Sequence, residues 1–376
     1  MAPSWVFPML PRDIVDQVDY LLQNSLLPIQ VDGFRKSHES HSFFDRFSVL
    51  IPCFLEPVRW EVIFSCQHPY WPPDVIFAAH DSDFQPLATN SSISSILKGW
   101  DSKDPSTLLR FLVELRNEYL QYQRKRVEEL KDSRLHFEVN TLESIEDLEM
   151  GLVTDGDNAR VIFSIPLHEL DLSKLARQSR LLLQPPNTGV VLQVCYPVQR
   201  EFTSSSAVPL IKLHAPNVLR EVFKVEDVRL PAWTDSMCLA EYIPKLLELL
   251  QSQIIDACAS LTLRRNFIEA LVPVFGRPLE AETDFGRKVS MIASAGVFTF
   301  LIHISLPLQF PKVQPTLLLQ SSQHFDSQGR PISRAYEDYP WSPRWDPSEM
   351  VSRICDFITE ENASFKQYCN ESLQYH

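Results

Sequence analysis

An internal repeat relates the two ends of this 376-residue chain at a spacing of 242 residues. The stretch HPYWPPDVIF at 68–77 falls on FPKVQPTLLL at 310–319, with two prolines of each stretch in register. The triplet Asp-Pro-Ser at 104–106 falls on the same triplet at 346–348. Because one ungapped offset relates both pairs, we expect two copies of one folding unit.

Each copy has the pattern of an antiparallel sheet flanked by helices. Prolines fix φ and cannot donate to a sheet ladder, so each proline-rich stretch predicts a rigid turn that leads into a strand. Apolar residues alternate before the turn, as in a strand with one buried face. Aspartate caps helices and proline suits their first turn, so each Asp-Pro-Ser triplet predicts a helix start. Further helices are expected near 14–22 and 263–271.

A candidate third, degenerate unit lies between the two copies. Residues 138–157 carry seven acidic and no basic side chains and are expected to form a loop or linker. The segment after them has no counterpart of the proline turn at the right spacing, but it has strands, a tryptophan and a terminal helix. These are expected near 160–166, 189–196 and 208–214, at Trp233, and from about 244 to 258.

These patterns predict an α+β fold class with tandem units, each a meander sheet with flanking helices. The expected division is an N-terminal unit at 1–135, an acidic linker with a degenerate middle unit at 136–260, and a C-terminal unit at 261–376.

A proline turn of this kind is familiar from the ubiquitin-conjugating fold, where a catalytic cysteine follows it. The irregular segments after the two turns, 74–99 and 316–344, contain no cysteine, so a thioester cannot form there. The seven cysteines form no CxxC pair and are expected to be reduced and mostly buried. No GxSxG, HExxH, Walker or dinucleotide-binding motif occurs. We therefore expect no enzyme, no catalytic residue, no cofactor and no metal site.

Charge and hydropathy disfavour nucleic acid and membranes as partners of this chain. The chain has 35 basic and 48 acidic residues, which disfavours nucleic acid because phosphate binding needs a concentrated basic surface. The longest apolar runs, such as 297–308, are shorter than the roughly 20 residues of a membrane helix, and the first residues lack a signal-peptide pattern. The expected location is cytoplasmic, nuclear or both.

The two turns, and above all YPWSPRWDPSEM at 339–350, resemble the BRE family. The resemblance spans the chain, with its sharpest part in the final third. It implies a string of inactive ubiquitin-conjugating-like (UEV or RWD) units in a scaffold subunit of BRISC-type deubiquitinase complexes. In that family the subunit joins a JAMM-type zinc metalloprotease and an Abraxas-type pseudoenzyme to a von Willebrand A-type adaptor. Such hetero-oligomers act in cytosolic ubiquitin editing and, in animals, in DNA-damage signalling.

A unit without a nucleophile can still bind a partner. Rigid proline turns and exposed aromatic side chains are expected to hold an extended peptide at low ordering cost. For Trp345 a place in the core is the favoured alternative, because it corresponds to Trp100. The candidate partner-binding residues are Tyr339, Trp341, Trp345, Phe310, Tyr70 and Trp71.

Three functions compete on these grounds. The leading hypothesis is a non-catalytic scaffold in a deubiquitinase complex. The alternatives are a stand-alone ubiquitin receptor that uses one UEV face and a cryptic conjugating enzyme with a displaced cysteine.

Overall fold

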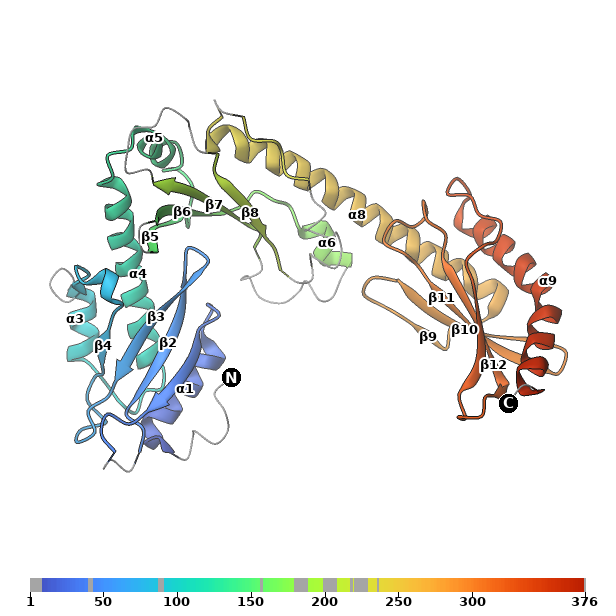
Figure 1. The fold of residues 1–376 in the computed structure, drawn as a ribbon, viewed down its shortest axis with the longest axis horizontal. Coiled ribbons are helices and arrows are strands. Elements are labelled where there is room, and N and C mark those ends of the chain that lie inside the picture. The colour runs from blue at the N-terminus through green and yellow to red at the C-terminus, as the bar shows by residue number, and fades with distance from the viewer. Residues whose placement is uncertain are drawn as a thin grey trace. The chain divides into compact units, whose positions relative to one another are not determined.

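The computed structural model describes residues 9–374 apart from 40–42, 87–90, 156–157, 179–188, 199–207, 217–218, 220–228 and 235–236. The first residues, where a signal peptide would lie, are outside the described residues. The described part is an α+β fold with three antiparallel sheets, which confirms the expected class (Figure 1).

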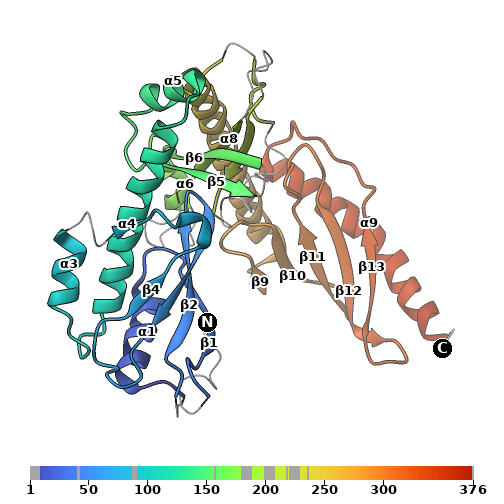
Figure 2. The same cartoon turned by 60° about the vertical axis from the view of Figure 1, so that its left-hand side comes forward.

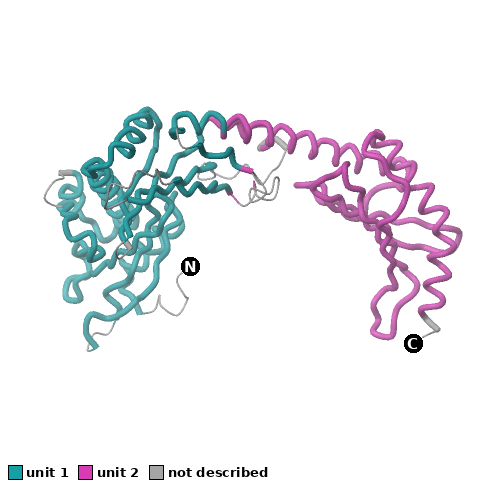
Figure 3. Tube along the Cα trace, turned by 45° about the horizontal axis from the view of Figure 1, so that its top comes forward, with its two compact units in different colours: residues 1–168, 186–215, 230–245 teal, residues 169–185, 216–229, 246–376 magenta. Residues whose placement is uncertain are grey.

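The chain separates into two compact units, coloured in Figure 3. Unit 1 comprises Met1–His168, Pro186–Ala215 and Leu230–Lys245. Unit 2 comprises Glu169–Pro185, Pro216–Arg229 and Leu246–His376. The three-part division expected from sequence stays a prediction.

The first sheet of unit 1 has the order β1-β2-β3-β4 (Figure 1). Helices α1 and α4 pack on one face of it, and side chains such as Phe47, Val49 and Trp60 are fully buried there. Each fully buried side chain of this size stabilises the fold by about 1.5–3 kcal/mol. The elements are α1 (Arg12–Asn24), β1 (Gln30–Arg35), β2 (Arg46–Cys53), β3 (Glu56–Ile63), β4 (Asp74–Ile76), the 3-10 helix η2 (Ala79–Asp81), α3 (Ser91–Lys98) and α4 (Thr107–Glu128).

The last sheet, in unit 2, has the order β13-β12-β11-β10-β9. Helix α9 and the C-terminal part of α8 cover one face of it through Phe267, Ile354 and Phe365 among others. The elements are α8 (Leu239–Phe275), β9 (Glu280–Ala281), β10 (Lys288–Ala295), β11 (Phe298–Ser305), β12 (Thr316–Phe325), β13 (Pro331–Tyr336) and α9 (Pro347–Gln374).

The sequence repeat is reproduced in the strand register. Arg46 of β2 lies opposite Ile63 of β3, and Lys288 of β10 lies opposite Ser305 of β11, so both partners shift by the same 242 residues. The next pairing repeats too, because β3 meets β4 in the register in which β11 meets β12. The two sheets therefore share one pairing scheme over these strands.

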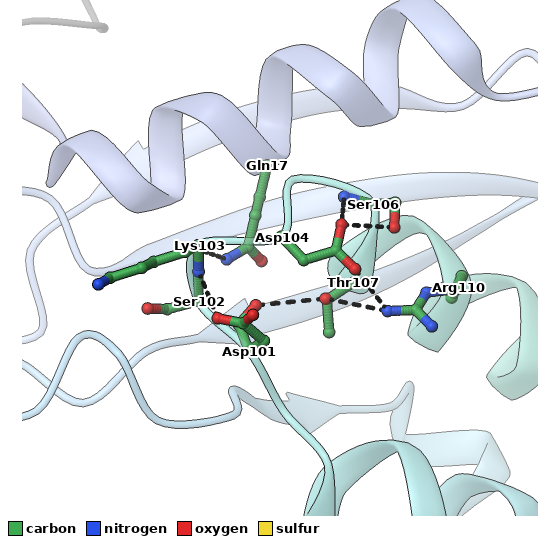
Figure 4. A network of polar contacts seen from close by, with 8 residues as sticks. All are labelled: Gln17, Asp101, Ser102, Lys103, Asp104, Ser106, Thr107 and Arg110. Carbon is green, nitrogen blue, oxygen red and sulfur yellow. Dashed lines mark hydrogen bonds and ion pairs between the residues drawn. The ribbon is translucent and has the colours of Figure 1, made fainter.

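The two Asp-Pro-Ser triplets behave differently at the helix starts. Asp346 caps α9, since its carboxylate accepts the backbone N–H groups of Ser348 and Glu349 at 2.9 and 3.1 Å. In the other copy α4 begins only at Thr107. Asp104 likewise accepts the Ser106 N–H, but its second donor is the Ser106 hydroxyl where Asp346 has the Glu349 N–H. Figure 4 shows this network, in which the Arg110 guanidinium lies 2.8 Å from Asp104. These hydrogen bonds, those from Ser106 first, hold the pKa of Asp104 below its ordinary value.

A middle sheet, with the order β5-β6-β7-β8, belongs to unit 1. The strands expected after residue 160 are present, but the acidic stretch 138–157 is no plain linker, because it contains the end of α5 and all of β5. Glu138 in this stretch is buried, and its carboxylate accepts the Tyr196 hydroxyl and the Leu239 N–H, each at 2.9 Å. The elements are α5 (Ser133–Thr141), β5 (Glu149–Asp155), β6 (Asn158–Pro166), α6 (Ser173–Gln178) of unit 2, β7 (Val191–Val198) and β8 (Leu210–His214).

The helices expected at 244–258 and 263–271 are one continuous helix, α8, which crosses the boundary expected at residue 260. No glycine or proline interrupts 245–272, and buried residues recur every three or four positions throughout. The buried stripe includes Leu246, Leu250, Ile254, Cys258, Leu261, Phe267 and Leu271.

By length and composition alone, α8 could also cross a membrane, and it is the one helix in the described part of the chain that could. This is weak evidence for a membrane, since core helices of soluble proteins meet the same criterion.

Candidate partner-binding surfaces

The proline turn of unit 1 carries an exposed aromatic cluster. The side chains of Tyr70 and Trp71 are each 53% exposed. The His68 ring stacks on Trp71 with centroids 4.4 Å apart, and its Nδ1 lies 3.0 Å from the Tyr70 hydroxyl. The Trp71 N–H closes the turn by donating to the His68 carbonyl at 3.0 Å. The rings are thus held in place before any partner arrives, which lowers the entropic cost of binding.

In unit 2 two of the candidate residues hold the turn from inside. Phe310 and Tyr339 are buried in the core of the last sheet. The Tyr339 hydroxyl donates to the Pro315 carbonyl at 2.5 Å, and burial keeps the pKa of this phenol above its ordinary value. A buried, hydrogen-bonded ring stabilises the turn and offers no surface to a partner.

The two candidate tryptophans of unit 2 are partly exposed. Trp341 donates from its indole Nε1 to the Pro311 carbonyl at 2.9 Å, and its ring centroid lies 6.5 Å from that of Trp345. The Arg353 guanidinium lies 5.7 Å from the centroid of the Trp345 ring, within cation–π range. Both tryptophans help to build the core edge and keep part of their surface in solvent.

A buried arginine that the sequence patterns did not single out positions this turn. Arg264, on α8, donates to the backbone carbonyls of Phe285 and Leu308 at 3.3 and 2.9 Å. Burial, and then the nearby Arg287, lower its pKa from the ordinary value. The sequence does place this arginine within the apolar stripe of a helix. A charged residue is rarely buried there unless it is paired, so its position could have marked it as a structural residue. Arg264 therefore fixes the chain just before Phe310.

The segment after the first turn forms a closed polar network. The buried Asp81 carboxylate accepts from the Tyr119 hydroxyl at 3.0 Å and from Gln123 and Arg126 at 3.3 Å each. Burial, and then Asp81, raise the pKa of Tyr119, which keeps the phenol protonated as a donor. Gln123 in turn accepts the Leu152 N–H at 3.1 Å and joins α4 to β5. These groups satisfy one another, so their arrangement is structural.

The two cysteines that precede the turn in the chain are not activated thiols. Burial raises the pKa of Cys53 to about 12. Burial, and then a hydrogen bond with Asp45, raise the pKa of Cys66 to about 11. Because the thiolate is the nucleophile, these environments disfavour thioester chemistry at either position. Within the described ranges, no group of three or more histidine, cysteine or acidic residues could hold a metal ion.

Comparisons with known proteins assign the chain to a family. The family model described as "Brain and reproductive organ-expressed protein (BRE)" matches residues 19–325, which include both proline turns. A protein of Danio rerio named "BRISC and BRCA1-A complex member 2" is 31% identical over 82% of this chain and 80% of its own length. A protein of Branchiostoma floridae with the same name is 31% identical over 86% of this chain and 84% of its own length.

The family model and both relatives each match most of the chain. The chain belongs to the BRE family.

Proposed function

We propose that this chain is a non-catalytic scaffold subunit of a deubiquitinase complex. The observation that carries the proposal is the pair of sheets that share one strand register, each with a proline turn between two of its strands and no cysteine in the segment after the turn. The names of the relatives, members of the BRISC and BRCA1-A complexes, support the same assignment.

The resemblance to the family implies which partners to propose. The chain would bridge a JAMM-type metalloprotease and its Abraxas-type pseudoenzyme to a von Willebrand A-type adaptor, in the cytoplasm and the nucleus. Two compact units on one polypeptide supply two separate surfaces, as a bridge requires. The exposed Tyr70–Trp71 cluster and the partly exposed Trp341 and Trp345 are the aromatic anchors proposed for these contacts, since such residues dominate interface energetics.

Affinity purification of the tagged native chain, followed by mass spectrometry, tests this function. We expect a JAMM protease, a pseudoenzyme and a von Willebrand A-type protein in the eluate. Trp71→Ala should reduce one partner by more than tenfold, since an aromatic hot spot contributes about 2 kcal/mol or more. Trp341→Ala is the matched change in the other unit. An eluate without any JAMM protease would refute the scaffold proposal.

The exposed aromatic cluster also favours a second function, a stand-alone ubiquitin receptor. Titration of isotope-labelled ubiquitin with the full chain separates the two proposals. Saturable shift changes that Tyr70→Ala abolishes support the receptor. An unchanged ubiquitin spectrum at high chain concentration removes it.

A further inference from the structure

An apolar pocket opens beside β4 in unit 1. It has a volume of about 420 Å³ and lies between β4, the segment 84–86, α3 and α4. Figure 2 shows α3 and α4 together beside β4. This volume is in the range of specific binding pockets, whose walls are mostly apolar. Its apolar walls are formed mainly by Val75, Phe77, Phe84, Leu97, Phe111 and Leu115.

The strand at this pocket has a free edge. β4 is the last strand of its sheet, and no strand in the described part of the chain pairs with its outer side. Ile76 is 50% exposed there. An unpaired edge offers backbone N–H and C=O groups to an added strand.

Unit 2 shows what fits at the equivalent edge. Its counterpart of β4 is β12, and β13 pairs with that strand on the outer side. Tyr336 of β13 lies opposite Leu317, which is the repeat counterpart of Val75. The Tyr336 ring is buried with its centroid 5.6 Å from that of Phe357, the counterpart of Leu115.

The pocket of unit 1 therefore occupies the place that an aromatic side chain fills in unit 2. Two of its walls, Val75 and Leu115, correspond to the residues that Tyr336 contacts or faces. The positions of β13 correspond to residues 89–94 of unit 1, which include the first half of the helix α3 (Ser91–Lys98) and no described strand. Unit 1 thus has the sheet edge and the pocket, and the described residues supply neither the strand nor the ring.

Charge defines the partner further. Asp74 is the one charged side chain among those that line the pocket, and it is exposed. Asp81 nearby is buried and paired with Arg126, so it adds no exposed charge to the rim. The exposed Asp74 carboxylate therefore favours a cationic side chain on the partner and disfavours an acidic one.

We propose that an extended segment of a partner protein adds to β4 as an antiparallel strand, places one aromatic or large aliphatic side chain in the pocket, and pairs a lysine or arginine with Asp74. The inference rests on the proposed function only in taking a protein as the partner. It assigns to the β4 edge a partner contact separate from the aromatic cluster of Tyr70 and Trp71.

Selection from a displayed library of random ten-residue peptides against the purified full chain tests this inference. Wild-type chain should enrich peptides with a bulky apolar residue near a lysine or arginine. Asp74→Lys should weaken a selected synthetic peptide by at least about tenfold, because the rim charge is reversed. Asp16→Lys is the matched control, since this exposed aspartate of α1 does not line the pocket, and it should leave affinity unchanged.

A second measurement shows whether the selected peptide binds at β4 or at another surface. Hydrogen exchange should slow in β4 when the selected peptide is bound, because its edge amides gain partners. Selected peptides without a basic preference, equal affinity for the Asp74→Lys chain, or unchanged exchange in β4 would each overturn the inference. Co-purification tests the proposed function independently: a chain that selects such peptides but recovers no JAMM protease refutes the scaffold and leaves the β4 site standing.

Discussion

Replacing Gly151 by alanine should loosen the junction between the first and middle sheets of unit 1. A Cβ at this position of β5 would lie 2.6 Å from Cζ and 2.7 Å from Cδ1 of the Phe54 ring. Phe54, at the tip of the β2–β3 hairpin, is buried and cannot move freely. Its N–H donates to Glu149 at 2.7 Å, and Arg116 binds both Glu149 and the Pro52 carbonyl.

The expected loss of unfolding free energy follows from overpacking at the Phe54 ring. Forcing a methyl group into a well-packed contact costs about 1–3 kcal/mol of unfolding free energy. Phe54→Ala alone should cost about 3–5 kcal/mol, because it empties a buried site. In the Phe54→Ala background, Gly151→Ala meets no ring and gains about 0.5–1 kcal/mol from replacing a strand glycine. The two changes should therefore compensate each other by about 1.5 kcal/mol or more.

Urea-dependent hydrogen exchange measured by mass spectrometry is the appropriate assay. It reports β2 and β5 separately from unit 2, whereas the unfolding of a chain with two units need not be two-state. Gly189→Ala is the matched control, because a Cβ there would meet no atom within 4 Å. Strictly additive changes, or a neutral Gly151→Ala, would refute the reasoning.

Three further changes test other parts of unit 1 and unit 2. Asp104→Asn should lower the free energy of unfolding at neutral pH, because the pKa of Asp104 is lower in the folded than in the unfolded chain. The difference from wild type should be complete above the unfolded pKa of about 3.9 and vanish as pH falls through the folded pKa. Urea titrations at several pH values measure this difference. Glu138→Ala should cost about 1–3 kcal/mol for each buried donor left unpaired, whereas Glu138→Gln should cost less, and faster exchange at the start of α8 would report it. Arg264→Met should leave the carbonyls of Phe285 and Leu308 without a donor and destabilise unit 2 by about 1–3 kcal/mol; an unchanged thermal midpoint would contradict this role.

Local sequence patterns anticipated the strands and the repeat. Alternation and proline positions predicted the regions of β2, β3, β10 and β11, and the common offset anticipated their shared register. The continuous helix α8 was missed because the expected unit boundary was placed inside an unbroken apolar stripe. The helical periodicity of apolar residues predicts where a helix ends better than an inferred domain boundary does.

Contacts between distant residues could not be predicted from one sequence. The acidic stretch 138–157 has the composition of a linker, but Glu138 is paired with Tyr196 and Glu149 with Arg116. The candidate aromatics share a residue type and differ in role, because Tyr339 is sealed in the core while Trp71 is exposed. Burial depends on tertiary packing, which local composition does not encode.

The proposed bridging role is tested most directly by reconstitution with and without this chain. The JAMM protease, the pseudoenzyme, the von Willebrand A-type adaptor and the chain would be co-expressed, and the mass of the purified assembly measured by light scattering. We expect one assembly that contains all four proteins, and loss of the adaptor from the protease pair when the chain is omitted. An adaptor that stays bound to the protease pair without the chain would contradict the scaffold function.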